Sequence, residues 1–155
     1  WAYLKNYKNS ILVFDSIPFR KSFISIYNTY APNYFEDNII KFLNDISKLS
    51  DKYSLFIKPK RSGLKKIYSK KYKNYLDKTE KFNILKYEYS PEDIIDKFDK
   101  VICLPFSSTA YIAKEMNKKV CYYDVVGIHK DFEKIIKDIP IINNFSDLQK
   151  WSNHE

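Results

Sequence analysis

The fold of this chain is decided by one stretch of sequence, Val101-Ile102-Cys103-Leu104-Pro105-Phe106-Ser107-Ser108-Thr109-Ala110-Tyr111-Ile112-Ala113-Lys114-Glu115-Met116. It opens with an uninterrupted apolar run after Lys100, which predicts a short buried strand. Pro105 ends this run, and consecutive hydroxyl residues follow. Ala110, Ala113 and Met116 then recur at a helical spacing. The stretch therefore predicts a strand, a turn lined with hydroxyls, and the N-terminus of a helix.

The hydroxyl turn Ser107-Ser108-Thr109 is a candidate phosphate site. The first backbone N–H groups of a helix lack intrahelical partners and lie at the positive end of the helix dipole, so they bind anions readily. Serine and threonine hydroxyls add further donors at the same place. In the alternative interpretation, which is the commoner one for such residues taken alone, Ser107 or Ser108 only caps the helix.

The rest of the chain alternates between strands and helices. Apolar runs predict further strands at 10–14, 53–57, 83–87, 119–124 and 141–142. Periodic or capped segments predict helices at 35–49, 91–98, 131–139 and 146–151, and Leu64, Ile67 and Tyr68 favour part of a helix within the basic run 60–81. This order predicts an α/β fold over residues 1–155, a single Rossmann-like domain with an open, mainly parallel sheet and helices on both faces.

The topology brings polar segments to one edge of the sheet. Ligands of such folds bind beyond the carboxyl ends of the strands. Four segments are expected to meet there: Asp15-Ser16, Lys58-Pro59-Lys60-Arg61, Tyr87-Glu88-Tyr89 and Phe106-Ser107-Ser108-Thr109. A basic corner beside a hydroxylated helix N-terminus predicts an anion site more strongly than either feature does by itself.

Composition narrows the function classes. The formal net charge of +8 favours anionic partners. With only two glycines, the chain has neither a dinucleotide fingerprint nor a P-loop, which disfavours a dehydrogenase or an NTPase. His129 and His154 stand apart from any nucleophile turn and from metal-ligand spacing, so we expect no metal and no cofactor. Cys103 and Cys121 lie in apolar runs, which predicts buried free thiols.

From Tyr53 onward, the order of elements resembles the C-terminal, nucleotide-sugar-binding half of bacterial GT-B glycosyltransferases. The similarity is closest to capsule and lipopolysaccharide transferases that use CMP-activated sialic-acid-like or Kdo sugars. The segments that carry it are Phe56-Ile57-Lys58-Pro59-Lys60-Arg61, Ser90-Pro91-Glu92-Asp93 with the helix and strand that follow, and Phe106-Ser107-Ser108-Thr109-Ala110 followed by Lys118-Lys119-Val120.

This resemblance implies a metal-independent glycosyltransferase and a donor site. It implies that the donor phosphate is held by Ser107, Ser108 and Thr109, with positive charge from Lys58, Lys60 and Arg61. The family has a histidine where this chain has a lysine. A lysine pairs with phosphate as a point charge, but it is a poor general acid near neutral pH.

Two further sets of residues are expected near this site. Tyr87, Glu88 and Tyr89 are candidates to flank the nucleobase and ribose of the donor, although tyrosines near a strand end more often pack against the core. Asp15 is a weak candidate for the catalytic base, and its more common role is that of a turn residue at a strand end. In GT-B enzymes, the general base that activates the acceptor usually lies on the other domain.

The expected partners follow from the same resemblance. They are a CMP- or UDP-linked sugar donor, a glycan or lipid-linked acceptor, and a missing N-terminal domain. Because the chain opens on Trp1, we expect it to be the C-terminal half of a longer two-domain protein and inactive by itself. The expected location is cytoplasmic, with peripheral contact to the inner face of the cytoplasmic membrane as an option.

Two alternatives stay open at this point. One is a related enzyme of the same architecture, such as a polyol-phosphate polymerase or a sugar epimerase. The other is a non-enzymatic basic module that binds RNA or an anionic membrane through the run 60–81 with its interleaved tyrosines. The order of elements matches no recognised nucleic-acid-binding fold, so no specific nucleic acid partner is expected.

Overall fold

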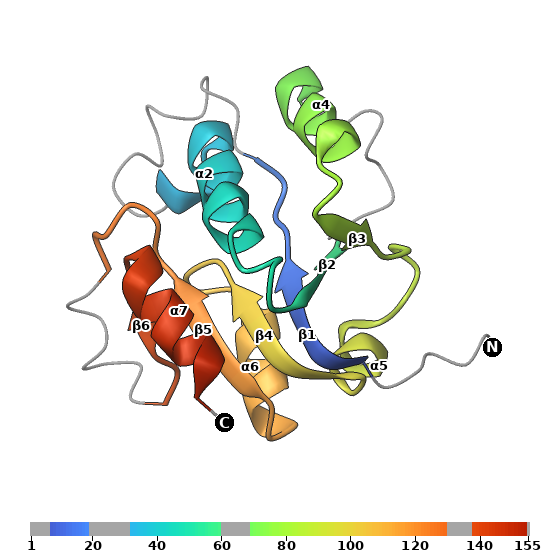
Figure 1. Ribbon diagram of the computed structural model, residues 1–155, viewed down its shortest axis with the longest axis vertical. Helices are drawn as coiled ribbons and strands as arrows, with labels where there is room; N and C mark the ends of the chain where they lie inside the picture. The colour runs from blue at the N-terminus through green and yellow to red at the C-terminus, as the bar shows by residue number, and fades with distance from the viewer. Residues whose placement is uncertain (1–6, 19–31, 60–68, 130–137, 155) are drawn as a thin grey trace.

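The computed structural model describes residues 7–18, 32–59, 69–129 and 138–154, and its centre is one parallel sheet (Figure 1). The strands are β1 (Tyr7–Phe14), β2 (Ser54–Lys58), β3 (Phe82–Ile84), β4 (Phe98–Cys103), β5 (Lys119–Tyr123) and β6 (Ile141–Ile142). Their spatial order is β3-β2-β1-β4-β5-β6, and every neighbouring pair is parallel. The predicted Rossmann-like α/β fold is confirmed.

Helices cover both faces of the sheet, because successive side chains of a strand point to opposite sides. In β1, Ile11 and Val13 belong to one buried cluster, and Leu12 and Phe14 to the other. The first cluster lies under α2 (Glu36–Ser47), α4 (Lys70–Lys78) and α7 (Phe145–Asn153). The second lies under α5 (Pro91–Ile95) and α6 (Ser108–Glu115), on the far side of the sheet in Figure 1. A short 3₁₀ turn, η2 (Pro32–Tyr34), leads into α2.

Several predicted boundaries are wrong; β1, for example, begins at Tyr7 rather than at residue 10. The strand expected to reach Tyr87 ends at Ile84, and the helix that begins at Pro91 ends at Ile95 rather than Phe98. Phe98 instead opens β4. The start of this helix agrees with its sequence signal, because the Ser90 hydroxyl accepts a hydrogen bond from the backbone N–H of Asp93 at 3.1 Å.

Two further expectations lie partly or wholly outside the described residues. The helix expected at 131–139 falls mostly on residues that the structure does not describe, as do Leu64, Ile67 and Tyr68. In the described part of the basic run, α4 follows Ser69, whose hydroxyl caps it by accepting from the N–H of Tyr72 at 3.0 Å. Lys70 and Lys71 are exposed on this helix, as is usual for a solvated charged face.

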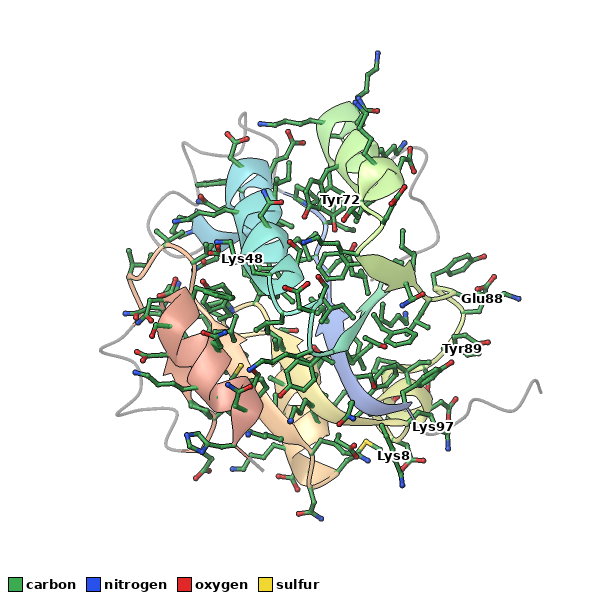
Figure 2. All side chains as sticks on the ribbon, in the orientation of Figure 1. Lys8, Lys48, Tyr72, Glu88, Tyr89 and Lys97 are labelled. Atoms are coloured by element: carbon green, nitrogen blue, oxygen red, sulfur yellow. The ribbon has the colours of Figure 1, made fainter. Side chains whose placement is uncertain are left out.

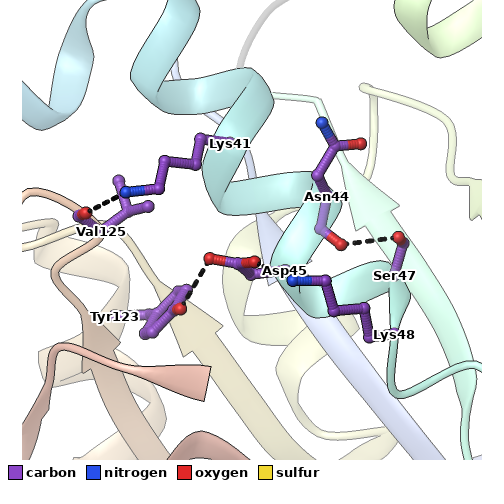
Figure 3. Close-up of polar contacts among 7 residues, drawn as sticks. All are labelled: Lys41, Asn44, Asp45, Ser47, Lys48, Tyr123 and Val125. Carbon is purple, nitrogen blue, oxygen red and sulfur yellow. Dashed lines mark hydrogen bonds and ion pairs between the residues drawn. The ribbon is translucent and has the colours of Figure 1, made fainter.

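Hydrogen bonds connect helix α2 to β5 and to the segment that follows β5 (Figure 3). The Tyr123 hydroxyl donates to Asp45 Oδ2 at 2.8 Å, and Lys41 Nζ donates to the carbonyl of Val125 at 3.1 Å. These contacts fix the chain where it leaves the carboxyl end of β5. Within the described ranges, no helix has the length and apolar composition needed to cross a bilayer.

Candidate functional site

The candidate site lies where the connections of the sheet change direction. The chain runs from β1 towards β2 and β3 on one side, and from β4 towards β5 and β6 on the other. In open α/β sheets, the crevice at such a switch point is the usual ligand site. A cavity of about 360 Å³ lies at the carboxyl ends of β1, β2 and β4. Its described lining residues are Phe14, Asp15, Ser16, Tyr34, Lys58, Pro91, Leu104, Phe106, Ser107, Ser108 and Thr109.

The hydroxyl turn forms one wall of this cavity. Ser107 is the residue before α6, but its side chain makes no capping hydrogen bond. Its Oγ instead lies 2.6 Å from Thr109 Oγ1, which in turn lies 3.4 Å from Cys103 Sγ. Ser108 is exposed, and its hydroxyl makes no hydrogen bond with the described residues. Ser107 therefore occupies the N-cap position of α6, but without the side-chain hydrogen bond that the capping interpretation expects.

Two tyrosines hold the backbone of the turn that precedes α6. The N–H of Ser107 donates to the carbonyl of Leu104 at 3.2 Å, which closes a tight turn over Pro105 and Phe106. The Tyr34 hydroxyl donates to the carbonyl of Pro105 at 2.9 Å, and the Tyr122 hydroxyl donates to that of Ser107 at 3.1 Å. Burial raises the pKa of Tyr34 to about 12, so its hydroxyl keeps its proton near neutral pH. The turn is thus preformed.

Lys58 supplies the positive charge of the cavity wall. It is 5% exposed, and its Nζ donates to the carbonyls of Pro59 and Tyr87, both at 2.9 Å. Burial lowers the pKa of Lys58, while the charges of Asp15 and Glu88 act in the opposite direction. An ammonium group has three donors, so these two carbonyls leave capacity for one further acceptor.

Asp15 lies beside Lys58 in the same cavity. It is 5% exposed, and its Oδ2 accepts a hydrogen bond from the Tyr72 hydroxyl at 3.0 Å. Tyr72 comes from α4, where Figure 2 labels it, so this helix supports the Asp15 carboxylate from outside the cavity lining. Asp15 is therefore a buried carboxylate of the cavity, placed directly after the end of β1. Its catalytic role stays a prediction.

Of the remaining predicted site residues, Tyr87, Glu88 and Tyr89 are not among the described residues that line the cavity. Lys60 and Arg61 lie outside the described residues. Tyr87, Glu88 and Tyr89 belong to the loop after β3, and Figure 2 shows Glu88 and Tyr89 at the periphery of the molecule. Tyr87 reaches the site only through its carbonyl, which accepts from Lys58 Nζ. The structure therefore brings together Asp15, Lys58 and the hydroxyl turn in the cavity lining, whereas Glu88 acts on Lys58 through its charge without lining the cavity.

A buried carboxylate that the sequence reasoning missed supports the neighbouring loop. Asp124 is fully buried just after β5. Its Oδ1 accepts from the Asn33 side chain at 2.7 Å, from the N–H of Val126 at 3.2 Å and from that of Gly127 at 2.9 Å. Its Oδ2 accepts from the N–H of His129 at 2.7 Å. The available signal was Gly127 three residues after Asp124, a spacing typical of turns.

The described residues contain no cluster of metal-ligand side chains, and both cysteines are buried. Among them, no group of three or more His, Cys, Asp and Glu residues is placed to hold a metal ion. Cys103 and Cys121 are buried free thiols, as predicted. Burial raises the pKa of Cys103 to about 12, so its nucleophilic thiolate is negligible near neutral pH.

The fold and the position of the cavity define a Rossmann-like α/β domain with a candidate ligand site at its switch point. The family model described as polysaccharide biosynthesis PFTS motif protein matches residues 2–152. The chain therefore belongs to this family and has a role in polysaccharide biosynthesis. If PFTS is taken as one-letter residue codes, it agrees with Pro105-Phe106-Ser107-Ser108 except that a serine stands in place of the threonine. No curated protein matches the chain significantly.

Proposed function

We propose that this domain binds a nucleotide-activated sugar and is the donor-binding domain of a metal-independent glycosyltransferase of the GT-B type. Its donor phosphate occupies the cavity between Lys58 and the hydroxyl turn Ser107–Thr109. Its role in polysaccharide biosynthesis agrees with this chemistry, because polysaccharides grow by sugar transfer from activated donors.

One observation carries the proposal: the buried residue Lys58 and a partly exposed hydroxyl turn line the same cavity at the switch point. When a sugar leaves its nucleotide, negative charge develops on the departing phosphate. Fixed donors at that position stabilise the transition state. Lys58 offers a charged donor, and the start of α6 offers backbone N–H groups with the Ser108 hydroxyl beside them.

The proposal extends to the whole protein. The general base that activates the acceptor hydroxyl belongs to a second, N-terminal domain, and Asp15 is the weaker alternative within this chain. The donor is CMP- or UDP-linked, and the acceptor is a glycan or a lipid-linked glycan of a bacterial capsule or lipopolysaccharide. The protein works in the cytoplasm, where contact with the inner face of the membrane gives it access to a lipid-linked acceptor.

Replacing Ser108 by alanine tests the phosphate site. We expect CMP or UMP to perturb the backbone amide NMR signals of residues 107–110 in the unaltered chain. Ser108→Ala should weaken nucleotide binding about tenfold or more, because a hydrogen bond to a charged group contributes about 1.5–3 kcal/mol. Calorimetric titration measures the change in affinity.

Ser47→Ala is the matched control, since this serine lies at the end of α2, does not line the cavity, and donates its hydroxyl to the carbonyl of Asn44. It should leave nucleotide affinity unchanged. A titration in which no signal near residues 107–110 moves would rule the proposal out. Binding to generic RNA that falls steeply with salt and ignores Ser108→Ala would favour the basic-module alternative.

A further inference from the structure

The backbone of Phe106 adopts an unusual conformation beside the cavity. The backbone φ of Phe106 is +64°, in the left-handed region that side chains with a Cβ rarely adopt. The other described non-glycine residues with positive φ are Asn9 and Asn117, and asparagine tolerates this region far better than phenylalanine does. Phe106 is the third residue of the tight turn that begins at Leu104, the place where such turns favour glycine.

This backbone strain is not explained by burial of the ring. Phe106 is 42% exposed although it is a large apolar residue. Its ring lines the cavity together with the hydroxyl turn that follows it in sequence. Strained residues of this kind concentrate at ligand sites, where the surrounding structure holds them in place.

The surroundings of the ring fix its orientation. The His129 ring meets it edge-on, with centroids 4.8 Å apart and planes at 80°. Tyr122 lies further off at 6.3 Å. The backbone on both sides is held by the hydroxyls of Tyr34 and Tyr122. A ligand that packs on this ring therefore does not have to immobilise it first, which favours binding.

We propose that the Phe106 ring stacks on the base of the nucleotide whose phosphate the hydroxyl turn holds. This inference rests on the proposed function and adds a determinant of the nucleotide part of the donor. A fixed, partly exposed aromatic face next to a phosphate site suits a planar base, because every base has a π-face that stacks on an aromatic ring. The cavity volume of about 360 Å³ is in the range of small-ligand sites.

The test compares ligands that differ by one part at a time: CMP, ribose 5-phosphate and inorganic phosphate, each titrated into the full chain. We expect Phe106→Ala to weaken CMP binding about five- to hundredfold. The affinities for ribose 5-phosphate and inorganic phosphate should stay within about twofold, since neither has a base. Phe106→Tyr and Phe106→Trp should restore CMP binding.

A second pair of variants separates the ring from the backbone. Phe106→Gly removes the ring and also the strain, whereas Phe106→Ala removes the ring and keeps the strain. Phe106→Gly should therefore unfold at a higher temperature than Phe106→Ala, while both bind CMP equally weakly. Recovery of CMP affinity in Phe106→Gly alone would mean that the backbone, not the ring, matters, and would overturn the inference.

The outcomes distinguish this inference from the proposed function. If Phe106→Ala weakens all three ligands equally, the residue only shapes the turn, and the stacking role is wrong. If it weakens ribose 5-phosphate as much as CMP but spares phosphate, the ring packs on the sugar, and the base assignment is wrong. If CMP binds in a Ser108-dependent way and ignores Phe106→Ala, only this inference fails. If no ligand binds, both fail.

Discussion

Asp124→Ala is expected to lower the free energy of unfolding by about 3–5 kcal/mol, because it removes a buried charged acceptor. The Asn33 side chain and the backbone N–H groups of Val126, Gly127 and His129 would lose their acceptor at the Asp124 carboxylate. Since Asp124 is fully buried, water does not readily take the place of its carboxylate as an acceptor. For a domain of this size, the melting temperature should fall by about 6–12 °C or more. Thermal and urea unfolding measure the change.

The matched control is Asp99→Ala, which removes an exposed carboxylate with no side-chain partner among the described residues. It should change the melting temperature by only a degree or two, as surface substitutions usually do. The melting temperature of Asp124→Asn should lie between those of Asp124→Ala and Asp99→Ala. Its amide oxygen still accepts hydrogen bonds, but its NH₂ group faces other donors. Equal melting temperatures for Asp124→Ala and Asp99→Ala would refute the importance of this buried carboxylate.

Much of the fold was predictable because its signals are local. The run Val101–Leu104 is apolar and short, Pro105 ends it, and the hydroxyl residues lead into a helical pattern. The rule that parallel strands place their carboxyl ends together then correctly grouped Asp15, Lys58 and Ser107–Thr109 in one cavity. This inference needed the fold class but not the order of the strands.

The end of β3 was not predictable, because a distant side chain decides it. Apolar residues continue to Leu85 and Tyr87, which favours a longer strand. In the structure, the carbonyl of Tyr87 accepts from the buried Nζ of Lys58 rather than joining the ladder. A buried ammonium group must find acceptors, and nothing in the local sequence indicates which carbonyl it takes.

The tyrosines of the site were missed for a related reason. Tyr34, Tyr72 and Tyr122 are three of fourteen tyrosines in the chain, and no prediction from the sequence placed them at the phosphate site. Each one also places a hydroxyl on a site group: the Pro105 carbonyl, the Asp15 carboxylate and the Ser107 carbonyl. Sequence spacing reveals which face of an element is buried, but not where the polar tip of a buried side chain ends.

Lys58→Met is expected to have the largest effect on ligand binding. The substitution keeps an apolar stem of similar length and removes the ammonium group. Affinity for CMP and for inorganic phosphate should fall about ten- to hundredfold, since a charged hydrogen bond to phosphate contributes about 1.5–3 kcal/mol. The variant should also melt at a lower temperature, because the carbonyls of Pro59 and Tyr87 lose their donor. Titrations therefore belong at a temperature where circular dichroism shows the folded state.

Lys52→Met is the matched control, because this exposed lysine lies before the start of β2 whereas Lys58 lies at its end. It removes one positive charge from the opposite edge of the sheet and should leave phosphate affinity nearly unchanged. An equal loss of affinity in both variants would mean that binding follows only the net charge. The Lys58 site would then have no role.

Asp15→Asn should act in the opposite direction to Lys58→Met. It removes the negative charge that Asp15 contributes to the described cavity lining, so inorganic phosphate should bind more tightly. Asp15 also raises the pKa of Lys58, and without it burial lowers that pKa further. The measurement is therefore made at about pH 6, far below the usual pKa of lysine, where the ammonium form is favoured. The amide oxygen of the substituted side chain still accepts from the Tyr72 hydroxyl, which limits the structural change. Opposite signs for these two neighbouring variants are what a phosphate between Lys58 and the hydroxyl turn requires. A loss of affinity in both would place the anion elsewhere.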